Sequence, residues 1–156
     1  MIKGKELEKR ANKVNLQGRQ SGIGLILQIP TPLILTNKGV IPKESTVDFA
    51  GLISGGRFLA FDAKETHSTT SFPMSNIKQH QFTYLDLVEK LGGIAFFLIQ
   101  FVTLYPNKAF CTPVSLIRKY QETTSRKSIP ISDFDIARLV DIDNYLEQTI
   151  KLYELG

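Results

Sequence analysis

A tight turn signal near the middle of the chain constrains the fold more than any other feature. Two strand-like segments, 46–53 and 57–64, flank the sequence Ser54-Gly55-Gly56. Glycine readily adopts the positive φ values that short hairpin turns require, so the two segments are expected to pair antiparallel. The chain is therefore expected to build its core around a β-sheet.

The length of this turn decides which side chains share a face of the hairpin. With a three-residue loop, Asp48 lies across from Asp62; with a two-residue loop, it faces Ala63 on the opposite side of the sheet. The longer loop would also collect apolar side chains on one face: Val47, Phe49, Ile53, Leu59, Phe61 and Ala63. Both registers remain open from the sequence, and the two aspartates come together only with the three-residue loop or an equivalent bulge.

Hydrophobic periodicity predicts alternating helices and strands around this hairpin. Helices are expected over 4–19, 76–91 with Ser75 as N-cap, and 114–121, and further strands over 23–29, 94–102 and 108–111. Loops are expected at 36–44 and 123–130, and an acidic helical tail over 131–156. The order predicts a single mixed α/β domain over residues 1–156 with the sheet at its centre.

The composition argues against membrane insertion and against a disulfide-bonded secreted fold. Charges alternate over residues 1–10, where a signal peptide would be apolar, and the most apolar run, 94–102, is about half the length of a spanning helix. Cys111 is the sole cysteine, cannot form an internal disulfide, and is expected to be a buried small hydrophobe. We expect a soluble cytoplasmic protein with no membrane partner.

The net charge of +4 is unevenly distributed along the chain. The first twenty residues carry +4 (six bases, two acids), and the last twenty-six carry −4 (two bases, six acids). This asymmetry predicts a DNA-facing region near the start of the chain and in the basic loops. The candidate cations are Lys5, Lys38, Lys43, Arg126 and Lys127. A solvated helix surface explains many such lysines equally well.

Two aspartates and a lysine on the hairpin form the one group of residues in the sequence that is typical of a catalytic site. Mg²⁺ prefers one or two carboxylates together with water and substrate phosphate oxygens, which Asp48 and Asp62 would supply. Lys64 follows Asp62 by two residues and therefore projects from the same strand face, where its ammonium could orient an attacking water. The pattern favours metal-dependent phosphodiester hydrolysis, although solvated strand-end residues would produce the same short pattern.

The residues around this constellation resemble the RecU family of Holliday junction resolvases. The matching segments follow in family order: Pro30-Thr31-Pro32, 45–51, 61–66, 71–73, His80-Gln81, Gly92-Gly93-Ile94 and 126–130. The resemblance covers roughly residues 4–130. It implies an α/β restriction-endonuclease-like (PD-(D/E)xK) fold, in which helices flank a central mixed sheet.

The resemblance also implies an activity and a set of roles. Members act as homodimers that bind four-way DNA junctions and, with Mg²⁺ or Mn²⁺, make paired nicks during recombination that leave 5′-phosphates. The roles carried over make Asp48, Asp62 and the Ala63 carbonyl metal ligands, Lys64 the catalytic lysine, and Glu8 an acid near the metal. Thr46 and Gln81 would lie beside the scissile phosphate, and Lys38 and Lys43 would contact the junction. The resemblance also implies that the protein works in a bacterial or phage-infected cell and has a recombinase as a partner.

The chain departs from the family pattern at two places. Asp62 stands where the family typically has glutamate, and the segment 33–45 is a short loop in place of the family's longer stalk. Two other functions therefore remain open. One is a related nuclease that acts on duplex or branched DNA, and the other is a junction-binding recombination modulator without significant catalysis.

Overall fold

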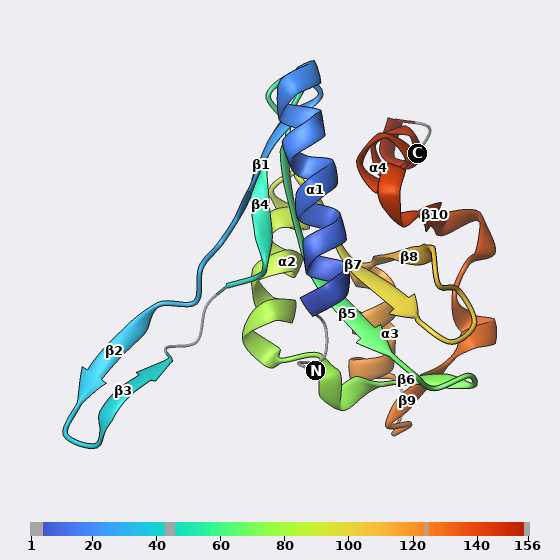
Figure 1. The fold of residues 1–156 in the computed structure, drawn as a ribbon. Coiled ribbons are helices and arrows are strands. Elements are labelled where there is room, and N and C mark those ends of the chain that lie inside the picture. Colours follow the sequence, from blue (N-terminus) through green and yellow to red (C-terminus); the bar gives the residue numbers. More distant parts are fainter. Residues whose placement is uncertain (1–4, 43–45, 124, 155–156) are drawn as a thin grey trace.

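A six-stranded mixed sheet forms the centre of the protein, for which a computed structural model describes residues 5–42, 46–123 and 125–154 (Figure 1). Its strands, in spatial order, are β1 (Gly24–Gln28), β4 (Phe49–Ile53), β5 (Phe58–Thr66), β7 (Ile94–Phe101), β8 (Lys108–Pro113) and β10 (Leu139–Asp141). β5 and β7 run parallel, and the other neighbouring pairs are antiparallel. The mixed α/β class predicted from the sequence is confirmed.

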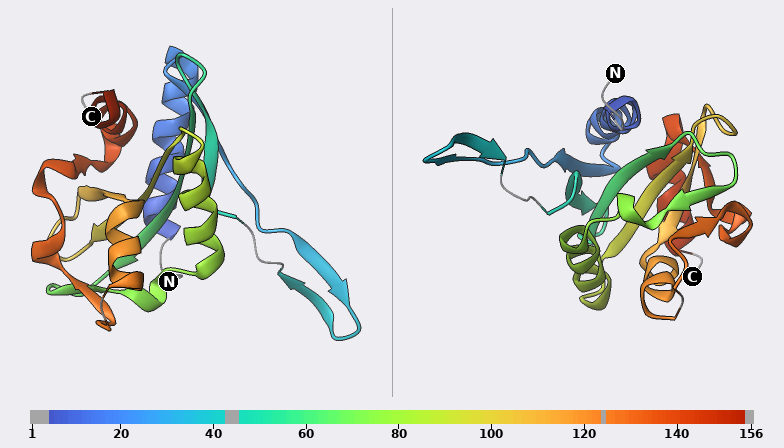
Figure 2. Two further views of the ribbon diagram at one scale, coloured as in Figure 1. Left: turned by 180° about the vertical axis from the view of Figure 1, so that it is seen from behind. Right: turned by 90° about the horizontal axis from the view of Figure 1, so that it is seen from below.

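Helices cover both faces of this sheet (Figure 2). α1 (Lys5–Ser21) and α4 (Tyr145–Glu154) pack on one face, in the same apolar cluster as Phe61, and α2 (Gln79–Lys90) and α3 (Val114–Glu122) pack on the other. β7 is buried along its whole length because it lies between the two layers of helices. Such a covered central strand gives its neighbour β5 a rigid position, and β5 carries the candidate site.

The hairpin of β4 and β5 has the register that the three-residue loop requires. Phe49 pairs with Phe61 and Leu52 with Phe58, and Gly55 and Gly56 in the turn have φ values of 93° and 81°. The expected apolar face is confirmed except for Val47, which packs in the opposite core. β4 begins only at Phe49, so the alternation of strand side chains does not extend back to Val47.

The start of α2 differs from the prediction. Ser75 lies in a separate 3₁₀ turn, Met74–Asn76, and the helix begins at Gln79. The residue at the N-cap position is Lys78, whose backbone N–H donates to Oε1 of Gln81 at 3.1 Å. A serine near a helix start is therefore an insufficient signal here, because the glutamine inside the helix caps it instead.

The predicted loop at 36–44 is wrong over most of its length. β2 (Leu33–Thr36) and β3 (Gly39–Pro42) form a separate two-stranded hairpin that projects from the body of the protein (Figure 1). Its turn is closed by Thr36, whose hydroxyl donates to the Gly39 carbonyl at 2.8 Å, and Gly39 has a φ of 108°. The segment is rich in leucine, isoleucine and valine, which favour strands over an irregular loop.

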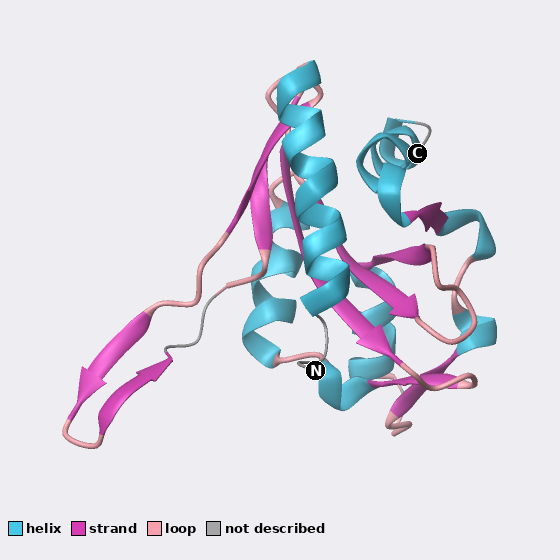
Figure 3. Ribbon diagram, in the orientation of Figure 1, coloured by secondary structure: helices cyan, strands magenta, loops and turns pink. Residues whose placement is uncertain are grey.

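The C-terminal part is less helical than predicted (Figure 3). The expected basic loop ends in β9 (Ser128–Pro130), which pairs with β6 (Ser71–Pro73). The tail then runs through short 3₁₀ turns and β10 before it enters α4, because Val140 fills the main core and its strand adds to the edge of β8. Within the described residues, no helix is both long and apolar enough to cross a membrane.

Candidate functional site

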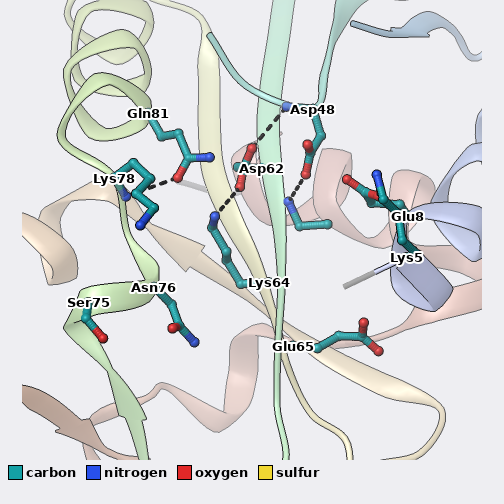
Figure 4. A pocket seen from close by; sticks show the side chains of 11 residues that line it. Lys5, Glu8, Asp48, Asp62, Lys64, Glu65, Ser75, Asn76, Lys78 and Gln81 are labelled. Atoms are coloured by element: carbon teal, nitrogen blue, oxygen red, sulfur yellow. Dashed lines mark hydrogen bonds and ion pairs between the residues drawn. The ribbon is translucent and has the colours of Figure 1, made fainter. Parts of the chain in front are cut away.

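Asp48 and Asp62 hold each other in place through the backbone (Figure 4). The backbone N–H of Asp48 donates to Oδ1 of Asp62 at 3.0 Å, and the N–H of Ala63 donates to Oδ2 of Asp48 at 3.0 Å. Asp62 is only 1% exposed. The two hydrogen bonds therefore fix both carboxylates at the point where β4 begins, with Asp62 next to Lys64 and Asp48 on the side of Glu8 (Figure 4).

Lys64 lies on the same face as Asp62, as the two-residue spacing predicts. Its Nζ forms an ion pair with Oδ2 of Asp62 at 3.0 Å, and its side chain is 16% exposed. Both carboxylate oxygens of Asp62 therefore have a donor in this structure. The ammonium remains at the surface of the cavity, within reach of a bound molecule.

α1 brings a third acid to the site. Leu7 and Ala11 bury one stripe of the helix in the core, which directs the neighbouring Glu8 toward the end of the sheet, where its carboxyl group meets that of Asp48. Lys5, one turn earlier, forms an ion pair with Glu8 at 3.3 Å. Glu8, which the family resemblance makes an acid near the metal, thus lies beside Asp48.

The pKa values of all three acids lie above their ordinary values. Burial, followed by the charge of Asp62, raises the pKa of Asp48 to about 6. Burial also raises the pKa of Asp62, although the neighbouring Lys64 opposes it. The pKa of Glu8 is raised by burial and by Asp48. Burial is the largest cause of each shift, and a cation bound beside these acids would stabilise their charged forms.

The donor groups fit a hard divalent cation that keeps part of its water shell. Asp48 and Asp62 supply carboxylate oxygens, and Ala63, whose carbonyl the family resemblance adds to the ligands, also lines the cavity. Across the described part of the chain, no group of three or more His, Cys, Asp or Glu side chains is arranged as a complete metal site. Two carboxylates and a carbonyl are the partial set that Mg²⁺ typically accepts, with water and substrate oxygens completing its shell.

The opposite wall of the cavity is built from hydrogen-bond donors. The cavity has a volume of about 310 Å³, and the 3₁₀ turn and the start of α2 supply Ser75, Asn76, Lys78 and Gln81 to it (Figure 4). Of these, sequence reasoning found only Gln81. The polar cluster between a short strand and a helix could have indicated the others, but Ser75 was assigned to helix capping.

The other predicted residues are more widely spread. Thr46 is exposed and does not line the cavity, and Lys38 lies at the tip of the β2–β3 hairpin. Arg126 and Lys127 line a second cavity beside the first. Lys43 lies outside the described residues.

The raised pKa of Asp48 predicts an unusual pH dependence of stability. Its pKa is about 6 in the folded protein against 3.8 in the unfolded chain, so its stabilising contribution is complete below pH 3.8 and is lost as the pH rises through about 6. We expect the metal-free protein to lose on the order of 1 kcal/mol of unfolding free energy between about pH 4.5 and 7. Urea denaturation with a chelator present measures this change.

Asp48→Asn is the matched variant for that measurement. It removes the ionisable group but keeps an oxygen that can accept from Ala63, so the loss between pH 4.5 and 7 should become smaller. Glu8 and Asp62, whose pKa values are also raised, account for the loss that remains. The pKa values of Asp86 and Asp143 are lowered by hydrogen bonds to basic side chains, so both acids titrate below this window. Equal pH dependence in the wild type and the variant would contradict the assignment.

Comparison with known proteins places the chain in a family. A family model described as RecU, Recombination protein U, matches residues 2–155. The Holliday junction resolvase RecU of Pediococcus pentosaceus is 34% identical over 148 residues, covering 85% of this chain and 72% of the relative. The protein of the same name from Bacillus pumilus is 34% identical over 140 residues, covering 81% and 67%. The central mixed sheet with helices on both faces is consistent with the restriction-endonuclease-like fold, and the chain belongs to the RecU family.

Proposed function

We propose that this protein is a Holliday junction resolvase, a Mg²⁺-dependent endonuclease that makes paired nicks in four-way DNA junctions during recombination. The observation that carries the proposal is the Asp48–Asp62 pair, held by two backbone hydrogen bonds beside Lys64 in a chain of the RecU family. Family membership supports divalent-metal dependence and junction DNA as the substrate. The choice of Mg²⁺ rests on the all-oxygen donor set, and Mn²⁺ is expected to substitute.

The proposed roles follow from the positions of the side chains. Asp48, Asp62 and the Ala63 carbonyl hold the metal, which when bound neutralises charge on the scissile phosphate and lowers the pKa of a nearby water. The Lys64 ammonium orients the attacking water or stabilises the charge that develops on the phosphate oxygens. Glu8 acts through Asp48, whose carboxylate it contacts. Gln81 holds the start of α2 with its Oε1, which leaves its Nε2 to donate toward a phosphate oxygen.

A homodimer would place two such sites on opposing strands, as symmetric nicking requires. Two sets of exposed apolar side chains support this part of the proposal: Leu25, Leu27, Leu52 and Phe58 on the sheet, and Leu33, Leu35 and Val40 on the hairpin. Large contiguous apolar surfaces are uncommon on soluble monomers, and an isolated two-stranded hairpin is only marginally stable in water. A second copy of the chain would cover both features.

Leu27→Glu tests the proposed dimer. Leu27 is 52% exposed on the edge strand β1, so the variant should fold while a charge is introduced into the apolar surface. We expect its dimer dissociation constant to rise by at least about tenfold in sedimentation equilibrium. Leu16→Glu is the control, because Leu16 is 55% exposed on α1. If the two variants associate equally well, this surface is not the dimer interface.

A direct cleavage assay tests the proposed function. We expect a synthetic four-way junction to be nicked symmetrically in the presence of Mg²⁺ and not in the presence of a chelator, as read on a denaturing gel. An equal length of linear duplex should compete poorly. Efficient cleavage of the duplex would favour a general nuclease of the same fold, and junction binding without any cleavage would favour a recombination modulator.

We infer that residues 1–156 form one nuclease domain that works in the cytoplasm of a bacterial or phage-infected cell. α1 and α4, near opposite ends of the chain, pack in one apolar cluster, which supports a single unit. The single cysteine, Cys111, is buried and unpaired, which is compatible with a reducing compartment. A recombinase partner remains an expectation from the family resemblance alone.

A further inference from the structure

A second cavity adjoins the candidate active site. It has a volume of about 550 Å³ and shares Ser75 with the catalytic cavity, so the two are separated by only one turn of chain. The 3₁₀ turn after β6 forms one wall, the end of α3 forms another, and the segment before β9 forms the third. A polymer that occupies the first cavity could therefore continue past Ser75 into the second.

The charge of the second cavity differs from that of the first. Arg126 and Lys127 are the charged residues that line it, and none of its lining residues is an acid. The catalytic cavity, by contrast, holds Glu8, Asp48 and Asp62 together. Because this cavity is lined by two cations and no acid, it can bind an anionic group directly, without a metal ion between them. A phosphodiester outside the reacting centre is such a group.

Hydrogen bonds connect the two cations to the wall that both cavities share. The backbone N–H of Met74 donates to the Lys127 carbonyl at 2.8 Å, and Pro73 pairs with Ser128 across the β6–β9 ladder. Arg126 hydrogen-bonds with the side chain of Tyr120, which in turn donates to Asp133. Tyr120 is 4% exposed, so Arg126 contacts a side chain that is itself fixed in the core.

We propose that the second cavity is a phosphate-binding subsite, in which Arg126 and Lys127 hold a non-scissile phosphodiester of the strand being cut. This inference rests on the proposed nuclease function and adds the path of the strand. The scissile phosphate lies between the Asp48–Asp62 pair and the donor wall of Asn76 and Lys78. The strand then passes Ser75, and the next phosphates along it reach the basic cavity.

The test compares two variants with the same change in charge. Arg126→Gln/Lys127→Gln removes the cations of the cavity, and Arg19→Gln/Lys151→Gln removes one arginine and one lysine that line neither cavity, both of them exposed. All binding is measured in an Asp48→Asn background on a synthetic junction without metal. We expect about a tenfold weaker affinity for the cavity variant and a slope of log affinity against log salt that is smaller by about one to two.

A neutral methylphosphonate placed at single positions of the strand locates the contact. In the Asp48→Asn protein, one position near the cleavage point should weaken binding severalfold, and in the cavity variant the same substitution should have no further effect. Two results would contradict the proposed subsite. In one, the methylphosphonate weakens binding by the cavity variant at every position as much as it does in the Asp48→Asn protein. In the other, the two double variants lose the same affinity for the junction. These binding measurements do not depend on cleavage. If the wild type failed to cut junctions, the proposed function would be rejected, but the measurements would still show whether Arg126 and Lys127 contact the substituted phosphate.

Discussion

Replacing Asp48 by asparagine should reduce junction cleavage by at least about a thousandfold while junction binding is kept. Asp48 is the acid that contacts both other acidic groups of the site: its N–H donates to Asp62 and its carboxylate meets Glu8. The amide is a poor ligand for a hard cation and removes one of the two carboxylates that hold it. Binding should be unchanged or tighter, since one negative charge facing the DNA is lost.

Two measurements separate a loss of chemistry from a loss of structure. The melting temperature of Asp48→Asn without metal should equal or exceed that of the wild type near pH 7, because the variant lacks a carboxylate whose pKa is raised to about 6. Added Mg²⁺ should raise the melting temperature of the wild type more than that of the variant. Asp135→Asn, at an exposed cap of a 3₁₀ turn, is the control and should cleave normally. If Asp48→Asn cleaved junctions at the normal rate, the assignment of Asp48 as a metal ligand would be wrong.

The parts of the site that lie on regular strands were accessible from the sequence. The shared face of Asp62 and Lys64 follows from the period of a strand, and the observed register agrees with the three-residue loop. Asp48 lies just before β4, so its position depends on its hydrogen bonds to Asp62 and Ala63. Glu8 followed from the family resemblance, since no local pattern connects a helix position to a strand forty residues away. Its approach depends on how Leu7 and Ala11 pack, which is a tertiary property.

The sequence did not predict the cavity wall formed by Ser75, Asn76 and Lys78, nor the projecting hairpin, and both failures have physical reasons. Capping signals at the start of α2 are ambiguous, because Ser75 and Gln81 can both satisfy helix-terminal N–H groups, and packing selects the second. The β2–β3 segment has polar residues in its turn and apolar residues on strands that are exposed to solvent. This pattern is typical neither of a buried strand nor of a solvated loop, so the sequence did not predict the hairpin. The proposed dimer would cover its leucines, and a contact between chains leaves no short-range pattern in one sequence.

Gly51 is where we expect the largest loss of stability from a single methyl group. A Cβ at this position would lie 1.8 Å from the Leu25 carbonyl oxygen and 2.9 Å from Cα of Ile26, which are backbone atoms of the neighbouring strand. β1 would have to move away from β4, with the loss of ladder hydrogen bonds and of the buried Ile26. Gly51→Ala should therefore cost about 3 kcal/mol or more of unfolding free energy in urea denaturation.

The control for this variant is Gly22→Ala, which separates steric overlap from ordinary glycine effects. Gly22 has a φ of 76° with nothing within 4 Å of the added Cβ, so only backbone strain of about 1 kcal/mol is expected. Equal stabilities of the two variants would show that β1 accommodates the methyl group freely. The displacement of β1 should also reach the site, since the Ile29 N–H donates to the Asp48 carbonyl at 2.7 Å. At a temperature where both variants are folded, Gly51→Ala should therefore cleave more slowly than Gly22→Ala, which would link the packing of β1 against β4 to the position of Asp48.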